Sequence, residues 1–215
     1  MRLFTVGHSN QTLPQLIELL QTHEVGAVAD VRSTPYSRRL PQFNRPDLEA
    51  ELPRQGITYV FLGDELGARR DEPEAYDGLQ AAYERVAELP AFQHGLGRVI
   101  TGVKKGLTLA LLCAERDPLT CHRAVLVSRH LVNRGLDVQH IHGDGRLESH
   151  GELEQRMQRA LQRLGVLDAC SGAVQLDLLG NPLSQHPEFN PADLLEQAYQ
   201  EQGKRIAYSK PLIAA

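Results

Sequence analysis

The chain has 215 residues, 41% of them hydrophobic and 23% charged, and its formal net charge is -4. This composition argues against wholesale disorder, and the charge argues against tight nonspecific binding to nucleic acid. No apolar run approaches the roughly 18 residues of a membrane span, and the N-terminal segment lacks the apolar stretch of a signal peptide. Three cysteines are too few for a disulfide framework. We therefore expect a cytoplasmic protein with no membrane partner.

Short apolar runs alternate with helical patterns over residues 1–147. The first helical pattern opens with a capping box, in which Thr12 caps and Gln15 lies three residues on, and Leu16 and Ile17 continue one apolar face. Similar spacings predict helices near residues 44–52, 76–86, 92–103 and 120–134. The apolar runs that we predict to be strands are residues 3–6, 27–31, 57–62, 107–112 and 138–141.

Apolar strands that alternate with helices are typical of a parallel sheet covered on both faces. Residues 1–147 are therefore predicted to form a three-layer α/β domain with a mostly parallel sheet, either Rossmann-like or flavodoxin-like. Residues 148–215 are predicted to form a helical C-terminal extension that packs on the sheet domain or on a partner and is dispensable for the pocket. Its first helix has a capping box at Ser149 and Glu152, and its apolar face comprises Leu153, Met157, Leu161 and Leu164. A second helix starts at Asn190.

Ligands of open α/β sheets bind at the carboxyl ends of the strands. All five predicted strands end in polar or reactive side chains, which predicts one anion-binding and catalytic pocket. In chain order, these side chains include His8 and Ser9, Asp30 and Arg32, Glu65, Cys113 and Glu115, and His140 and His142.

Four arginines, Arg32, Arg38, Arg39 and Arg45, lie in a segment without acidic residues. Guanidinium groups suit phosphate and carboxylate ligands. Arg32 follows a strand directly, so it is predicted to bind an anion, and Arg38 is a further candidate. The alternative is a solvated loop that pairs with the acidic stretch 64–77.

Cys121 is predicted to lie in the first turn of a helix capped by Thr120. The partial positive charge of a helix N-terminus lowers a thiol pKa and attracts anions. Cys121 is therefore predicted to be the most reactive thiol, with His122, Arg123 and Ser9 at the anion site. In the alternative interpretation, Cys121 is a small, inert core residue.

Cys113 ends an apolar strand and pairs with Cys121 across a seven-residue loop. The two cysteines are either a redox pair or, with His122, ligands of zinc or another divalent metal. Cys170 is interpreted as structural. A fourth metal ligand would come from His8, His140 or His142, of which the last two alternate on one strand and point to opposite faces.

Several established motifs are missing. A phosphatase-like or rhodanese-like loop needs an arginine six residues after its cysteine, but Leu119 and Val127 stand at those positions. The sequence also lacks a Walker loop, a dinucleotide-binding glycine motif after the first strand, and the zinc-protease and serine-hydrolase motifs.

Several short segments of the sequence, in the same order along the chain, resemble a bacterial and archaeal family catalogued as domain of unknown function number 488. The resemblance covers roughly residues 3–145 and implies a shared fold and a pocket built from the matching residues, without an activity. Its most specific part is the Cys-Ala-Glu and Cys-His-Arg block. The segments that carry it are residues 5–9, 30–32 with Pro35 and Ser37, 56–59, 66–67, 112–115 and 121–123.

The leading hypothesis is an enzyme that acts on a phosphate-bearing substrate, such as a nucleotide or a nucleic-acid end. Glu115 or Asp30 would be the acid/base, with His8 as a further catalytic residue, and Cys121 would be a nucleophile, redox thiol or metal ligand. Two alternatives are a noncatalytic module that senses a nucleotide or metal, and a zinc-clamped structural domain. The expected partners are an anionic small molecule or nucleic-acid end, and a second copy of the chain.

Overall fold

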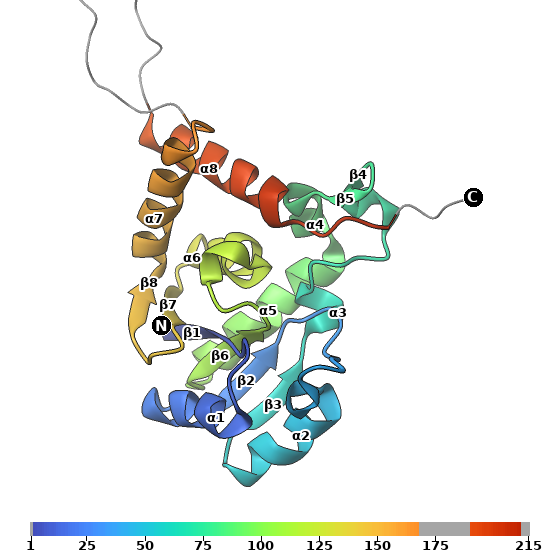
Figure 1. The fold of residues 1–215 in the computed structure, drawn as a ribbon, viewed down its shortest axis with the longest axis vertical. Coiled ribbons are helices and arrows are strands. Elements are labelled where there is room, and N and C mark those ends of the chain that lie inside the picture. The colour runs from blue at the N-terminus through green and yellow to red at the C-terminus, as the bar shows by residue number, and fades with distance from the viewer. Residues whose placement is uncertain (1, 168–189, 212–215) are drawn as a thin grey trace, which may run out of the picture.

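The computed structural model describes residues 2–167 and 190–211, and it confirms the predicted three-layer α/β class (Figure 1). A six-stranded sheet has the order β3-β2-β6-β1-β7-β8, in which β8 is antiparallel to β7 and the other pairings are parallel. The strands are β1 (Arg2–Gly7), β2 (Ala27–Asp30), β3 (Thr58–Phe61), β6 (Leu109–Cys113), β7 (Asp137–Ile141) and β8 (Leu147–Ser149).

Helices cover both faces of this sheet, and each face has its own apolar cluster. Helices α1 (Leu13–Thr22) and α2 (Arg45–Arg54) cover one face. The other face packs against α5 (Pro90–Lys104), a π-helical segment (Arg123–Ser128) that continues into α6 (Arg129–Val132), and α7 (His150–Arg163). Shorter helices are α3 (Gly63–Leu66), α4 (Tyr83–Glu88) and three 3₁₀ turns, Pro41–Phe43, Pro73–Ala75 and Pro118–Thr120.

Alternate residues of the inner strands point to opposite clusters. Phe4 and Val6 of β1 pack toward α1 and α2, whereas Leu3 belongs to the opposite cluster. In β6, Leu112 and Cys113 are divided in the same way. Burial on both faces explains why these strands are continuous apolar runs in the sequence.

Two predicted helix starts are confirmed in detail. Thr12 and Gln15 form the capping box of α1, and Ser149 and Glu152 form that of α7. Each box satisfies two free backbone N–H groups with side-chain oxygens. These local interactions are visible in sequence because they involve residues three positions apart.

The predicted helix over residues 76–86 is wrong in its first half. A hairpin of β4 (Tyr76–Asp77) and β5 (Gln80–Ala81) stands there, and α4 begins only at Tyr83. Gly78 has a φ of 59°, a left-handed conformation that suits a hairpin turn and interrupts a helix. Another correction concerns Leu164, which is 59% exposed, because α7 ends at residue 163 and its apolar face ends with Leu161.

The C-terminal segment is joined to the α/β core at both of its described ends. β8 pairs with β7, and α8 (Pro191–Ile206) crosses the outside of the α6–α7 layer toward the hairpin (Figure 1). The Ala81 amide donates to the Tyr208 carbonyl oxygen at 2.9 Å. A boundary at residue 147 stays a prediction, and Cys170 lies outside the described residues. None of the described helices is long and apolar enough to cross a membrane.

Gly7, at the end of β1, allows the loop after β6 to come close. A methyl group at this position would lie 1.8 Å from the Glu115 carbonyl oxygen. We therefore expect Gly7→Ala to lower the free energy of unfolding by about 1–3 kcal/mol, the usual cost of overpacking. Urea denaturation followed by circular dichroism measures this change.

A matched control is Gly97→Ala on the exposed face of α5, where an added methyl group meets no atom within 4 Å. Alanine is the better helix former, so this variant should gain about 0.5–1 kcal/mol. Equal stability of Gly7→Ala and the wild type would show that the loop does not depend on the close approach.

Candidate functional site

The strand ends stay paired beyond the sheet, which gathers their side chains at one edge. The amides of His8 and Ser9 donate to the carbonyls of Cys113 and Ala114 at 3.0 and 2.9 Å. The Val31 amide donates to the Leu112 carbonyl at 3.1 Å. The segments that follow β1, β2 and β6 therefore lie side by side, as the predicted pocket requires.

Two thiols, an imidazole and a carboxylate form a compact cluster at this edge. Both thiols donate to the same oxygen, Glu115 Oε2, over 2.9 Å from Cys113 Sγ and 3.1 Å from Cys121 Sγ. His122 Nδ1 lies 3.7 Å from Cys113 Sγ. The three ligand atoms of Cys113, Cys121 and His122 all lie within 4.8 Å of one another.

Hydrogen bonding orients the imidazole of His122 toward the sulfurs. Its Nε2 lies 3.0 Å from the Val31 carbonyl oxygen. A carbonyl oxygen can only accept, so Nε2 carries the proton. In the neutral ring, the Nδ1 lone pair therefore points to the side where Cys113 and Cys121 lie.

The capping prediction at Thr120 is wrong. Thr120 ends a 3₁₀ turn whose capping side chain is Asp117, which accepts from the Leu119 amide at 2.9 Å. Cys121 has extended backbone, and its carbonyl accepts from the amides of residues 124 and 125. Cys121 is thus the residue just before the helix. Its thiol remains near the helix N-terminus, but its exposed fraction is only 1%.

The environment separates the acidities of the two thiols. Burial raises the pKa of Cys113 well above that of a free thiol, and the neighbouring Cys121 adds to this effect. Burial opposes ionisation of Cys121 as well, but the neighbouring Cys113 thiol and the charges of Arg123 and His122 outweigh it and lower the pKa of Cys121. Burial likewise acts to lower the pKa of His122, but the contact with Cys121 dominates and raises it. Cys121 is thus the preferred thiolate of the pair.

Arg123 is fully buried, and its donors are used within the protein. It donates to the carbonyl oxygens of Glu115 at 2.8 Å and Arg116 at 3.3 Å, and its Nε lies 3.4 Å from Thr5 Oγ1. In this geometry, Arg123 holds the loop between the two cysteines. A bound anion would have to replace these bonds.

Asp30, Arg32 and His8 form a second group beside the thiols. Arg32 Nε donates to Asp30 at 2.9 Å, and the Tyr59 hydroxyl donates to the same carboxylate at 2.7 Å. His8 stacks on Phe43, and its Nδ1 lies 2.9 Å from the Ser9 carbonyl oxygen. That bond leaves His8 Nε2 to accept from Arg32 over 3.3 Å.

A pocket of about 320 Å³ opens onto the thiol cluster. Arg32 from one group and Cys113, Glu115 and His122 from the other reach its wall. Sequence reasoning missed several lining residues, because they come from segments far from the strand ends. They are Arg69, whose guanidinium lies 4.7 Å from the Tyr208 ring, with Tyr83, Ile206 and Tyr208.

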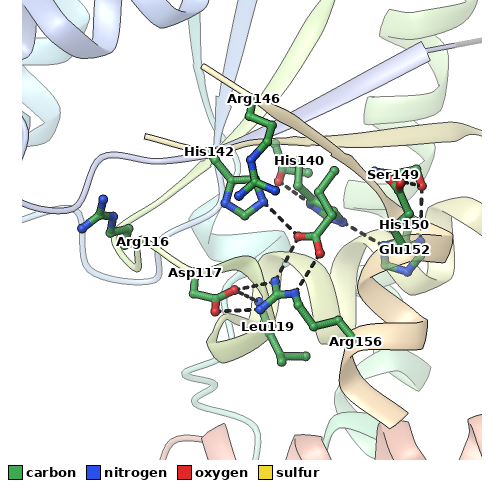
Figure 2. A network of polar contacts seen from close by, with 12 residues as sticks. Arg116, Asp117, Leu119, His140, His142, Arg146, Ser149, His150, Glu152 and Arg156 are labelled. Atoms are coloured by element: carbon green, nitrogen blue, oxygen red, sulfur yellow. Dashed lines mark hydrogen bonds and ion pairs between the residues drawn. The ribbon is translucent and has the colours of Figure 1, made fainter. Parts of the chain in front are cut away.

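Other predicted site residues lie elsewhere. Arg38 and Arg39 are exposed, and none of the hydrogen bonds between described residues involves their side chains. Ser9 has a φ of 48°, and its hydroxyl donates to Asn10. Neither His140 nor His142 is near the thiols: His140 is buried against Thr5 and His150, whereas His142 pairs with Glu148 (Figure 2).

The loop between the cysteines is also tied to α7. Arg156 of α7 donates to both oxygens of Asp117, at 2.7 and 2.9 Å, and to Glu148 at 2.8 Å (Figure 2). These charge-assisted bonds lower the pKa of Asp117 despite its partial burial. Together with Arg123, Arg156 fixes both sides of the loop that carries Glu115.

The fold and this edge cluster define an α/β protein with a thiol, imidazole and carboxylate site at the strand carboxyl ends. The chain belongs to the family described as Domain of unknown function DUF488, whose family model matches residues 12–130. The predicted family is thereby confirmed, and the match includes Cys113, Cys121 and His122 but not His8. Comparisons with curated proteins and with solved structures found no match. The finer Rossmann-like or flavodoxin-like assignment stays a prediction.

Burial of His8 makes stability depend on pH. Desolvation lowers its pKa to about 4, below the ordinary 6.5. Between pH 4 and 6.5 the unfolded chain binds a proton that the folded chain excludes, so stability falls as the pH drops through this window. We expect His8→Gln to reduce this pH slope by up to one proton, about 1.4 kcal/mol per pH unit.

Urea midpoints at pH 7.5, 6.5, 5.5 and 4.5 measure the slope for both proteins. The remaining slope of the variant comes in part from other histidines, since desolvation also lowers the pKa of half-buried His130 and of buried His150 to about 4. Identical slopes in His8→Gln and the wild type would contradict a neutral His8 in the folded state.

Proposed function

We propose that this chain is an enzyme that acts on a phosphate-bearing substrate, such as a nucleotide or a nucleic-acid end. One observation carries the proposal: a single pocket brings the cations of Arg32 and Arg69 to the same wall as Cys113, Glu115 and His122. Cations beside reactive side chains are what an enzyme for an anionic substrate needs.

Arg69 is the better candidate to hold the phosphate. It is exposed, and the structure gives its guanidinium only the face of Tyr208 as a neighbour among the interactions of the described residues. Arg32 shares its charge with Asp30 and donates to His8, so less of its guanidinium is free. The hydroxyl residues Ser33 and Thr34 also line the pocket and add donors for phosphate oxygens.

Glu115 is the better candidate for proton transfer. Its carboxylate reaches both thiols, yet the residue is exposed at the pocket, so a proton can pass between the cluster and a substrate or water. Asp30, by contrast, is completely buried and accepts from Arg32 and Tyr59. We therefore assign Glu115 as acid/base and Asp30 as the residue that positions Arg32.

The rest of the pocket wall is compatible with a nucleotide. Tyr83 and Tyr208 supply aromatic surface, and Ala68 and Ile206 supply apolar surface. Aromatic rings stack on nucleobases regardless of base identity. A wall that combines cations with aromatic rings favours a nucleotide over inorganic phosphate alone.

The burial of the thiols favours a second candidate function. Cys113 and Cys121 are 2% and 1% exposed, which limits direct attack of sulfur on a substrate. A noncatalytic module that senses a nucleotide or a metal through the same pocket is consistent with this burial. Turnover distinguishes the two functions, since a sensor binds the nucleotide and returns it unchanged.

Phosphate binding is tested by Arg69→Gln. We expect inorganic phosphate and adenosine monophosphate to raise the melting temperature of the wild type by mass action. The substitution should weaken binding at least about tenfold, since a hydrogen bond to a charged group contributes about 1.5–3 kcal/mol. Thermal shift over a range of ligand concentrations gives the affinities.

Arg54→Gln is the matched control, because Arg54 is an exposed arginine of α2 that does not line the pocket. It should respond to both ligands as the wild type does. An equal loss of response in both variants would indicate only a general charge effect. An unchanged response in Arg69→Gln would place the anion site elsewhere.

A further inference from the structure

We propose that Cys113, Cys121 and His122 bind one zinc ion, and that its fourth coordination position opens to the pocket beside Glu115. The inference rests on the proposed function in that the metal would lie in the same pocket. The metal site itself is argued from the three donors, which belong to the part of the chain that the structure describes.

The donor set fits zinc by chemistry. Two soft thiolates and one imidazole suit zinc, which is a borderline-soft ion, whereas magnesium and calcium prefer oxygen ligands. Three protein ligands are also typical of zinc sites that keep one position for water or substrate. A closed structural site would instead have four protein ligands.

The spacing of the donors is compatible with a shared zinc ion. Zinc–sulfur bonds of about 2.3 Å and zinc–nitrogen bonds of about 2.0–2.1 Å imply sulfur–nitrogen separations of about 3.5 Å. His122 Nδ1 lies 3.7 Å from Cys113 Sγ, and all three donor atoms lie within 4.8 Å of one another. Only small side-chain movements would be needed to bring the three donors around an ion.

The surroundings hold the ligands in place. Metal-binding histidines usually donate their other ring N–H to a carbonyl or carboxylate, and His122 donates Nε2–H to the Val31 carbonyl. The cysteine loop is fixed on one side by Arg123 and on the other by Asp117 with Arg156. An ion would therefore enter a site whose ligands are already oriented.

Zinc also gives Glu115 a defined task. Without metal, the Glu115 carboxylate accepts from both thiols. Zinc binding releases the two thiol protons, so these donors disappear and the carboxylate is free to accept from a zinc-bound water. The buried thiols would then serve as ligands and would not need to reach the substrate themselves.

The test titrates the purified, metal-free chain of 215 residues with Zn²⁺ and with Co²⁺ as a spectroscopic probe. We expect one ion per chain, with the visible bands of tetrahedral Co²⁺ and a thiolate-to-cobalt charge-transfer band. Cys113→Ser, Cys121→Ser and His122→Gln should each weaken binding at least tenfold, with folding checked by circular dichroism. Cys170→Ser, which changes the third thiol of the chain, and His94→Gln, which changes an exposed histidine of α5, should bind as the wild type does.

A second measurement does not depend on variants. Zinc should slow iodoacetamide labelling of Cys113 and Cys121 in the wild type at least tenfold, and labelling of Cys170 should stay the same. Absence of stoichiometric metal, normal binding by the three ligand variants, or loss of binding in Cys170→Ser would overturn the site. Loss of metal in Glu115→Gln would overturn the open fourth position.

The same samples separate this inference from the proposed function. A phosphate response without metal binding would overturn the zinc site and leave the phosphate-binding pocket intact. Metal binding without a phosphate response would overturn the phosphate-binding pocket and leave the zinc site intact. Retention of both by the wild type, with metal lost only in the ligand variants, is the expected result.

Discussion

The buried guanidinium of Arg123 is the interaction on which the site depends. It fixes the Glu115 and Arg116 carbonyls on one side, and its Nε reaches Thr5 on the other. From Thr5, a chain of hydrogen bonds continues across β1, β7, α7 and α8, through His140, His150 and Tyr199 to Glu154. Burial lowers the pKa of His140 and His150, so both rings are neutral. Because the Tyr199 hydroxyl donates to Glu154, all donors of this chain can point in one direction, from Arg123 toward Glu154.

This arrangement explains why the reactive cluster can be both buried and ordered. A buried cation costs desolvation energy and is tolerated only when its donors are satisfied, as those of Arg123 are by the loop carbonyls. The same cation lies close enough to favour a thiolate at Cys121. The absence of a side chain at Gly7 gives the loop room to approach. One side chain thus sets the position of Glu115 and part of the electrostatics around the sulfurs.

The sequence predicted what short-range patterns control. The five main strands, the capping boxes at Thr12 and Ser149, and the gathering of Cys113, Glu115 and Cys121 follow from local spacing and from where strands end. The roles of arginines were less accessible. Arg32 and Arg123 donate to groups within the protein because the fold brings distant segments together. No spacing rule distinguishes such a buried arginine from one that is available to a ligand. The hairpin at Gly78 is hidden in the sequence because Tyr76, Leu79, Tyr83 and Val86 have helical spacing, although Gly78 turns the chain between β4 and β5.

The pocket is lined by residues inside and outside the family match. Its reactive residues lie within the family match, 12–130, whereas Ile206 and Tyr208 on its wall follow α8. Tyr208 faces Arg69, and its carbonyl accepts from the Ala81 amide, so the C-terminal segment shapes the side where a phosphate would bind. The expectation that residues 148–215 are dispensable for the pocket is therefore hard to reconcile with its lining. The thiol cluster thus lies inside the matched region, whereas part of the wall around it comes from residues outside that region.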